Sequence, residues 1–166
     1  MRRAALSLML ASGLAGSLAG CGFTPMYAEP ATGSGLRRIA VSTPDNRLGY
    51  RLREQLEDAL GFDRASPALY RLETSVEQSR RALGRRIDDT ASRYELTVRA
   101  VWVLTPLDGR PALTGDETVT TTYEAADQPY AAIAAQQDGE ERAAAELSRM
   151  IRLDLAQALN PASAGR

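Results

Sequence analysis

The sequence predicts an α+β protein, a two-layer sandwich in which two helices pack on one face of a four-stranded sheet. Two observations support this: some segments alternate apolar and polar residues with the period of a strand, and others repeat apolar residues at helical spacing. Along the chain they follow the order β-α-β-β-β-α. Because the strands are apolar on one side only, the second sheet face should meet water or a partner.

The first two elements are a short strand and a helix. The strand is expected over residues 36–42, where Ile39 and Val41 share one face. The segment Thr43-Pro44-Asp45-Asn46 then predicts a helix start, with Thr43 or Asp45 as the N-cap. Gly61 is expected just beyond the helix end. The apolar stripe of this helix is Leu48, Leu52, Leu56, Ala59 and Leu60.

Three strands are predicted in the middle of the chain. The first covers residues 70–77, and a polar connection from Ser79 to about Thr90 follows it. Strict alternation from Tyr94 to Leu104 gives the clearest strand of the chain. A turn at Pro106-Leu107-Asp108-Gly109 leads to a threonine-rich strand from about Ala112 to Glu124.

The last predicted helix runs from about Tyr130 to Asn160-Pro161. Asp138 and Glu141 have the spacing of a capping box, which would allow a break at Gly139. Residues 161–166 are expected to be frayed. The apolar stripe of the helix is Leu147, Ile151, Leu155 and Leu159.

Composition excludes several kinds of chemistry. The chain has 166 residues, a net charge of −1, no His and a single Cys, and all of its 20 basic residues are Arg. Without His, catalytic triads and zinc-protease motifs are excluded, and one Cys makes neither an intrachain disulfide nor a Cys-rich zinc site. The near-zero charge argues against a nucleic-acid partner.

Carboxylate pairs are the remaining candidates for catalysis. Adjacent acids occur at Asp88-Asp89, Asp116-Glu117 and Glu140-Glu141, and two carboxylates suffice for glycoside hydrolysis. All three pairs fall on predicted surface turns or helix starts, and only 5% of the chain is aromatic. We therefore expect no enzymatic activity, no metal and no cofactor.

The N-terminus has the pattern of a lipoprotein signal. Arg2 and Arg3 precede a stretch, residues 4–18, that contains only Ala, Leu, Met, Ser and Gly. The stretch ends in Leu18-Ala19-Gly20-Cys21, which resembles the bacterial lipobox. These features predict a signal peptide over 1–20, a lipidated tether over 21–35 and an α/β sandwich domain over 36–160. The covalent lipid on Cys21 is the one attached group expected.

Sorting follows from the residue after the lipidated cysteine. An Asp there typically retains lipoproteins of Gram-negative bacteria in the inner membrane, and this chain has Gly22. We therefore expect the outer membrane, with the protein facing the periplasm. Two or more acyl chains anchor a protein stably. The expected mature chain carries 18 Arg against 21 acidic residues, a net charge of −3.

The opening of the mature chain, Cys21-Gly22-Phe23-Thr24-Pro25-Met26-Tyr27, resembles that of the LptE family, the lipopolysaccharide-assembly lipoproteins. The predicted element order is also similar, and the segments Asn46–Tyr50 and Glu141–Ala145 resemble the alphaproteobacterial branch. The resemblance implies a non-enzymatic protein that binds lipopolysaccharide. It also implies a plug and assembly partner of LptD, the outer-membrane β-barrel that inserts lipopolysaccharide.

Four arginines in the predicted connection between the second and third strands are the main candidate binding residues. Guanidinium groups bind phosphate in a bidentate manner, so the loop would hold lipid A phosphates or acidic residues of the barrel wall. The alternative is a solvated hairpin tip that Asp88 and Asp89 partly neutralise. The four are Arg80, Arg81, Arg85 and Arg86.

Other features leave alternatives open. Val101, Trp102 and Val103 make one strand end apolar on both sides, which indicates either a partner contact or ordinary burial under the helices. The run Thr118–Thr122 indicates an exposed strand face. At the level of function, the main alternative is an auxiliary periplasmic lipoprotein of an ABC-type lipid or solute transporter, and a purely structural envelope lipoprotein is a third possibility.

Overall fold

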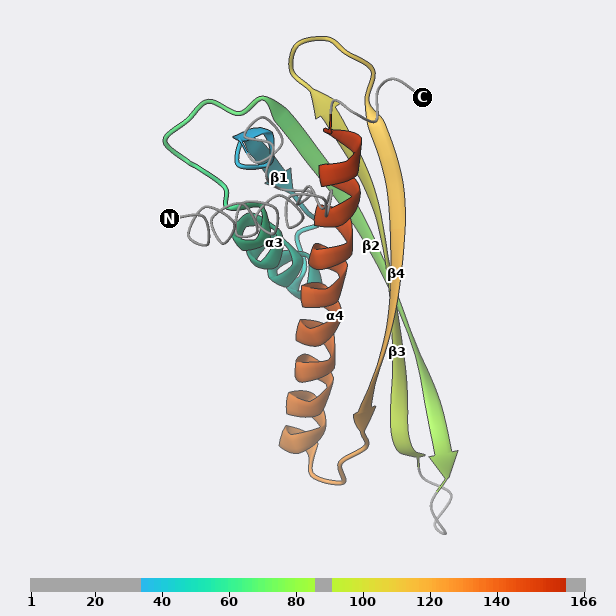
Figure 1. The fold of residues 1–166 in the computed structure, drawn as a ribbon. Coiled ribbons are helices and arrows are strands. Elements are labelled where there is room, and N and C mark those ends of the chain that lie inside the picture. The colour runs from blue at the N-terminus through green and yellow to red at the C-terminus, as the bar shows by residue number, and fades with distance from the viewer. Residues whose placement is uncertain (1–33, 86–90, 161–166) are drawn as a thin grey trace, which may run out of the picture.

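The computed structural model describes residues 34–85 and 91–160, which form a two-layer α+β sandwich (Figure 1). The four-stranded sheet has the order β1-β2-β3-β4, with β1 parallel to β2 and the other pairs antiparallel. Both helices cover the same face, so the predicted fold class is confirmed. The elements are β1 (Ile39–Ser42), α3 (Arg47–Leu60), β2 (Tyr70–Arg85), β3 (Ala91–Pro106), β4 (Leu113–Glu124) and α4 (Pro129–Ala158).

Several predictions concern residues outside those described. The signal peptide, Cys21, nearly all of the predicted tether, Arg86 and the expected frayed end at 161–166 belong to this group. The described chain begins with a helical turn at residues 34–36, in which Leu36 is buried. The first strand therefore starts at Ile39, three residues later than predicted.

Helix α3 begins at Arg47, one residue later than a cap at Asp45 implies and three later than a cap at Thr43 implies. Asn46 is the N-cap, because its side-chain oxygen accepts a hydrogen bond from the backbone N–H of Gly49 at 2.8 Å. The prediction of Thr43 or Asp45 was therefore wrong. A side chain at Gly49 would collide with the carbonyl of Pro44, so the tight entry to the helix requires glycine there. Gly61 ends the helix in the left-handed conformation, as predicted.

The core lies between the sheet and the two helices. Each element contributes the side chains that its sequence period places on one face, so the predicted stripes of both helices are confirmed. The fully buried large side chains are Ile39, Leu52, Leu56, Leu72, Val98, Leu104, Leu147, Ile151 and Leu155.

The hairpin of β2 and β3 is longer than predicted. Residues 79–85 belong to β2, so most of the expected polar connection from Ser79 to Thr90 is strand. Apolar alternation stops before this part of the strand, but pairing with β3 continues through Arg81 opposite Glu95 to Arg85 opposite Ala91. Cross-strand polar pairs therefore maintain the strand where apolar burial no longer does.

Helix α4 is continuous, so the capping-box pattern does not break it at Gly139. Asp138 forms an ion pair with Arg142 one turn later and caps no helix. Gly139 is buried against β4, where a Cβ atom would lie 3.1 Å from Cδ1 of Tyr123. Glycine at this position lets the helix approach the sheet closely.

Trp102 is only 3% exposed, which confirms ordinary burial under the helices. Its ring lies over Gly115, the residue opposite it on β4. Val101 points to the other face of the sheet and remains 37% exposed. The two faces of this strand end thus have different environments.

Replacement of Gly115 with Ala should destabilise the fold by about 1–3 kcal/mol, because the new methyl group would displace a packed indole ring. A Cβ there would lie 2.6 Å from Cε2 of Trp102. Denaturant unfolding followed by Trp102 fluorescence measures the change. Gly35→Ala is the matched control, since its Cβ would lie 3.9 Å from Leu159. Equal stabilities of the two variants would contradict the packing argument.

The environment of Glu117 predicts that the free energy of unfolding depends on pH. Burial and a hydrogen bond to the Asp154 carboxyl raise the pKa of Glu117 above its ordinary value of 4.5. The folded state thus favours the protonated carboxyl, and its contribution to stability is lost as the pH rises through the raised pKa. Glu117→Gln should therefore stabilise the protein at neutral pH, with no gain in acid. Urea unfolding at pH 4 and pH 7 tests this, and parallel pH profiles for the two proteins would rule it out.

Candidate functional site

The two layers do not cover the sheet evenly. Strand β1 pairs only with Tyr70–Glu73, so from Thr74 onward no described strand lies on the outer side of β2. Helix α3 covers the same end of the sheet as β1, and α4 alone extends along the rest (Figure 1). We call the end of the sandwich at the β2–β3 turn the distal end. There the sheet and α4 face each other with no third element beside them.

A groove of about 460 Å³ opens between α4 and the distal sheet. Two tyrosine rings and aliphatic side chains form its walls, and the polar groups are a guanidinium, an amide and the carboxylates of Glu124 and Asp127. A second hollow of about 320 Å³ shares Arg80 and Gln136 and extends along β2. The main groove is lined by Arg80, Tyr94, Tyr123, Glu124, Ala125, Ala126, Asp127, Ala132, Ile133 and Gln136.

Arg80 lines both this groove and the second hollow. Its guanidinium carbon lies 4.7 Å from the ring centroid of Tyr94, and its nitrogen Nη1 is 3.5 Å from the Tyr123 hydroxyl and 3.4 Å from Gln136 Oε1. The hydrogen bond to Tyr123 raises the pKa of Arg80, so the side chain stays charged. All of these partners are uncharged, so none of them neutralises the guanidinium.

The neighbouring Arg81 points to the opposite face of the sheet. Its guanidinium forms a 2.8 Å ion pair with Glu95. We call this face, which neither α3 nor α4 covers, the open face. On it, Arg99 pairs with Asp116 at 3.1 Å. These arginines already have carboxylate partners, whereas the contacts described above for Arg80 are with uncharged groups.

The four arginines expected in one loop are therefore arranged differently. Arg80, Arg81 and Arg85 lie on strand β2, so their placement in a connection was wrong. The alternation of a strand separates Arg80 from Arg81, and Arg86 lies outside the described residues. Ligand binding by these arginines stays a prediction for all four, Arg80, Arg81, Arg85 and Arg86.

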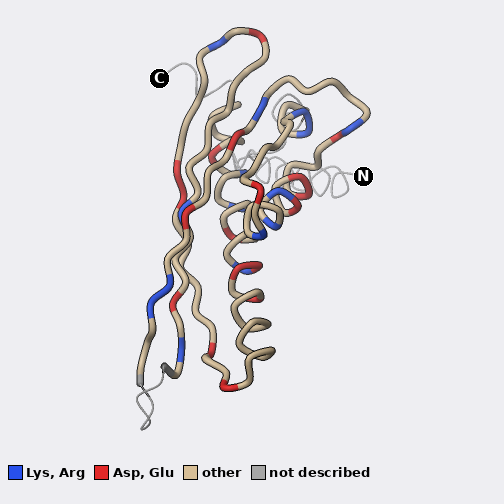
Figure 2. Tube along the Cα trace, turned by 180° about the vertical axis from the view of Figure 1, so that it is seen from behind, with Lys and Arg blue, Asp and Glu red and all other residues tan. Residues whose placement is uncertain are grey.

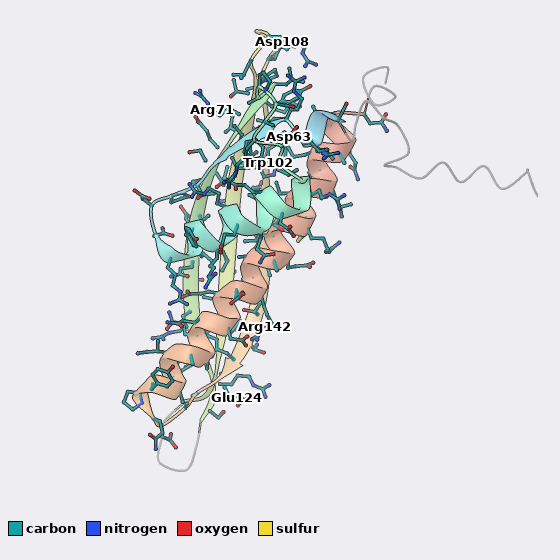
Figure 3. The ribbon with its side chains drawn as sticks, turned by 90° about the vertical axis from the view of Figure 1, so that its left-hand side faces the viewer. Asp63, Arg71, Trp102, Asp108, Glu124 and Arg142 are labelled. Atoms are coloured by element: carbon teal, nitrogen blue, oxygen red, sulfur yellow. The ribbon has the colours of Figure 1, made fainter. Side chains whose placement is uncertain are left out.

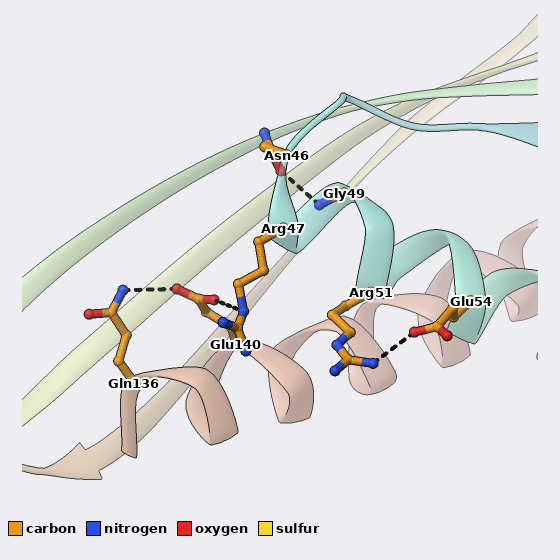
Figure 4. Close-up of polar contacts among 7 residues, drawn as sticks. All are labelled: Asn46, Arg47, Gly49, Arg51, Glu54, Gln136 and Glu140. Carbon is orange, nitrogen blue, oxygen red and sulfur yellow. Dashed lines mark hydrogen bonds and ion pairs between the residues drawn. The ribbon is translucent and has the colours of Figure 1, made fainter. Parts of the chain in front are cut away.

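A buried carboxylate joins the groove to the start of α3 (Figure 4). Glu140 is only 5% exposed, and its oxygens lie 3.5 Å from Arg47 Nε and 2.9 Å from the Gln136 amide nitrogen. Glu140 was expected at a surface helix start, which is wrong because α4 begins eleven residues earlier, at Pro129. The carboxylate orients Gln136, whose amide oxygen then faces Arg80.

Comparison with protein-family models matches residues 36–155 to LptE, described as lipopolysaccharide-assembly. The match covers nearly all of the sandwich domain. The chain belongs to the LptE family. A search of curated proteins finds no match.

Three solved structures of lipoproteins are similar to this chain. A lipoprotein from Caulobacter crescentus is 50% identical, with a TM-score of 0.66 over 77% of this chain and 94% of that one. A minor lipoprotein from Acinetobacter baumannii is 14% identical, with a TM-score of 0.51 over 72% and 94% of the two chains. Lipoprotein B from Nitrosomonas europaea is 16% identical, with a TM-score of 0.52 over 78% and 86%. The last two show that the fold is shared.

Other features of this LptE-family chain bear on its site. Among residues 34–85 and 91–160, no helix is long and apolar enough to cross a membrane. In the same residues, no three His, Cys, Asp or Glu side chains are grouped as metal ligands. The candidate site in the described part of the chain therefore consists of the groove, the open face of the sheet and the buried Glu140.

The sequence analysis missed three residues of the groove: Tyr94, Tyr123 and Gln136. Two signals pointed to them. Arg80 lies an even number of residues from Leu72, which places both on the helix side of one strand. The first turns of α4, Pro129–Gln137, contain no charged residue, as Figure 2 shows. An uncharged stretch of helix facing an arginine on the helix side of the sheet indicates a contact surface.

Proposed function

We propose that this LptE-family protein is anchored in the outer membrane through lipid on Cys21. There it would plug the LptD β-barrel, assist its assembly and bind lipopolysaccharide. The family match over residues 36–155 supports a role in lipopolysaccharide assembly. The barrel partner, the outer-membrane location and the direct binding of lipopolysaccharide are the proposed parts.

The observation that carries direct binding is the environment of Arg80. Lipid A combines phosphate groups with sugars and acyl chains, so its site needs a cation beside apolar surface. The contacts that Arg80 makes with described residues are to uncharged groups, and Tyr94 and Ile133 provide apolar walls. A guanidinium forms two parallel hydrogen bonds to a phosphate, which suits this geometry.

The open face of the sheet suits a polar barrel interior. It carries cross-strand ion pairs, Arg93 with Glu124 at 2.6 Å and Arg99 with Asp116 at 3.1 Å. Between them, the hydroxyls of Thr97 and Thr120 lie 3.2 Å apart. The lumen of an outer-membrane barrel is polar, so such a face would stay hydrated or exchange hydrogen bonds with it. The family match gives no support to the transporter-lipoprotein alternative.

Arg80→Ala should weaken lipopolysaccharide binding about 10- to 100-fold, since a hydrogen-bonded charged group contributes about 1.5–3 kcal/mol. Arg81→Ala is the matched control, because it removes the same side chain from the opposite face. Titration of the purified protein with lipopolysaccharide at two salt concentrations measures both. If the two variants lose the same affinity, or neither loses any, the groove is not the binding site.

Affinity purification of the Cys21-lipidated protein from outer membranes should recover a large β-barrel in about equal amount. Thr120→Arg places a bulky charge on the open face and should reduce barrel recovery while lipopolysaccharide binding persists. Cys21→Ala should release the protein from the membrane fraction. Recovery of an inner-membrane transporter in place of the barrel would contradict the proposed function.

A further inference from the structure

The outer edge of strand β2 is unpaired over its distal part. Strand β1 pairs with β2 only as far as Ser42 opposite Glu73, and the hydroxyl of Thr74 donates to the Ser42 carbonyl at 3.4 Å where β1 ends. No described strand continues β1 along β2 beyond that point. In Figure 3, β2 forms the margin of the sheet below α3. We call residues 74–83 of β2 the free edge.

The register shows which backbone groups of the free edge point outward. The N–H of Leu107 donates to the carbonyl of Leu69, one position beyond Tyr70 in the pairing with β3. Because backbone groups alternate along a strand, the odd-numbered residues of β2 bond to β3 and the even-numbered ones face outward. The bond from the N–H of Tyr70 to the carbonyl of Arg38, on the β1 side, agrees with this. The outward N–H and C=O groups therefore belong to Val76, Gln78, Arg80 and Ala82.

Two hollows follow the free edge on the helix side of the sheet. One, of about 230 Å³, is lined by Val76 and Gln78 of β2 and by the buried Glu140 of α4. The other is the 320 Å³ hollow, which Gln78 and Arg80 line. These β2 side chains share the helix side, because each lies an even number of residues from buried Leu72. The hollows thus have the two-residue spacing of side chains on one face of a strand.

The opposite edge of the sheet, along β4, is covered differently. Arg142 of α4 donates to the backbone carbonyl of Thr122 at 3.0 Å, and Figure 3 shows this arginine on the helix. Helix α4 also packs closely on β4 at Gly139. On the free edge of β2, by contrast, Gln78 and Ala82 are exposed. The free edge is therefore the more accessible of the two.

An extended polypeptide is the occupant that these features select. N–H and C=O groups presented at every second residue match the backbone of another β-strand, and a lipid chain has no such repeat of donors and acceptors. The free edge also lacks two common barriers to pairing. Residues 74–83 contain no proline, and their register with β3 has no bulge. Alternate side chains of an added strand would enter the two hollows.

A segment of the barrel partner is favoured over a second copy of this chain. Each free edge contains Arg80, Arg81 and Glu77, so two copies would bring four arginines together against two glutamates. Like charges on neighbouring strands oppose pairing. Wall strands of a closed barrel have no free edge, so the pairing segment would be a loop or a terminus of the barrel.

The chain's own residues 21–33 are a less suitable occupant. They span at most about 45 Å when fully extended. The part of β2 from Tyr70 to Gln78 alone takes about 27 Å of that length. About five residues would remain to pair with the free edge, and the lipidated Cys21 would be at their end.

We propose that the free edge of β2 binds an extended segment of the barrel partner as an added strand in line with β1. Backbone hydrogen bonds provide the affinity, and the two hollows provide the specificity. This inference rests on the proposed barrel partnership and names the surface and the mode of contact. The pairing uses the backbone of Arg80 and not its guanidinium. The open face adjoins the free edge, so one barrel contacts both.

Amide hydrogen exchange in the free protein and in its purified complex with the barrel tests the proposal. The outward amides of residues 76–82 should exchange at least ten-fold more slowly in the complex, because the added strand accepts their hydrogen bonds. Their odd-numbered neighbours are bonded to β3 in both states, so their rates should change little. The amides of Thr118 and Thr120, which face outward on β4, are the matched control and should keep their rates.

Two exchange results would overturn the added strand while leaving the barrel partnership intact. One is equal exchange of the free edge in the two states. The other is equal protection of the outward amides of β2 and β4, since general burial in the barrel would then explain both. If no barrel is recovered with the protein, the proposed function fails together with this inference.

A proline variant removes one outward donor. Gln78→Pro should lower the affinity for the barrel about three- to ten-fold, the value of one backbone hydrogen bond. Gln78→Ala keeps the backbone donor and should bind within about two-fold of the parent. Thr118→Pro on the edge of β4 is the matched control, and equal losses for the two prolines would overturn the inference. The emission of buried Trp102 checks folding, and the exchange measurement decides the question without any substitution.

A photo-crosslinking amino acid at position 78 identifies the occupant. In the complex purified from outer membranes, we expect a crosslinked peptide from a loop or a terminus of the barrel. A crosslink to a second copy of this chain would overturn the inference, and so would a crosslink to residues 22–33 of the same chain.

Discussion

The pairing of β2 with β3 is the interaction on which the rest of the structure depends. Both strands have 16 residues, and their ladder runs from Tyr70 opposite Pro106 to Arg85 opposite Ala91. One register along this length decides which side chains face the helices. It places Arg80 in the groove and Arg81 on the open face. A shift by one residue would exchange all of these positions.

Unequal element lengths give the two ends of the sandwich different chemistry. Strand β1 has 4 residues and α3 has 14, whereas α4 has 30. The end that all of them cover has a complete core, and the distal end has only α4 above the sheet. There the first turns of α4 leave a groove rather than a packed layer. Buried Glu140, which contacts Arg47 and Gln136, lies where the double cover becomes single.

The sequence predicted the elements whose side chains divide between core and water. Alternation from Tyr94 to Leu104 and the stripe from Leu147 to Leu155 correspond to buried faces. The distal part of β2 was not predictable in this way, because polar residues occupy both of its faces and only the partner strand shows that it is extended. The N-cap at Asn46 and the close approach at Gly139 depend in the same way on backbone contacts that a single sequence does not display.

The candidate ligand-binding arginine is distinguished by its partners and not by its place in an arginine-rich segment. Arg81 and Arg99 are already paired with carboxylates on a solvated face, so an anion would have to compete with an existing ion pair of small net benefit. Arg80 contacts a ring, a hydroxyl and an amide, which orient its charge without neutralising it. Binding of an anion there replaces water and leaves no carboxylate unpaired. Density of charge in the sequence therefore indicates a candidate segment, and the register distinguishes Arg80 from Arg81 within it.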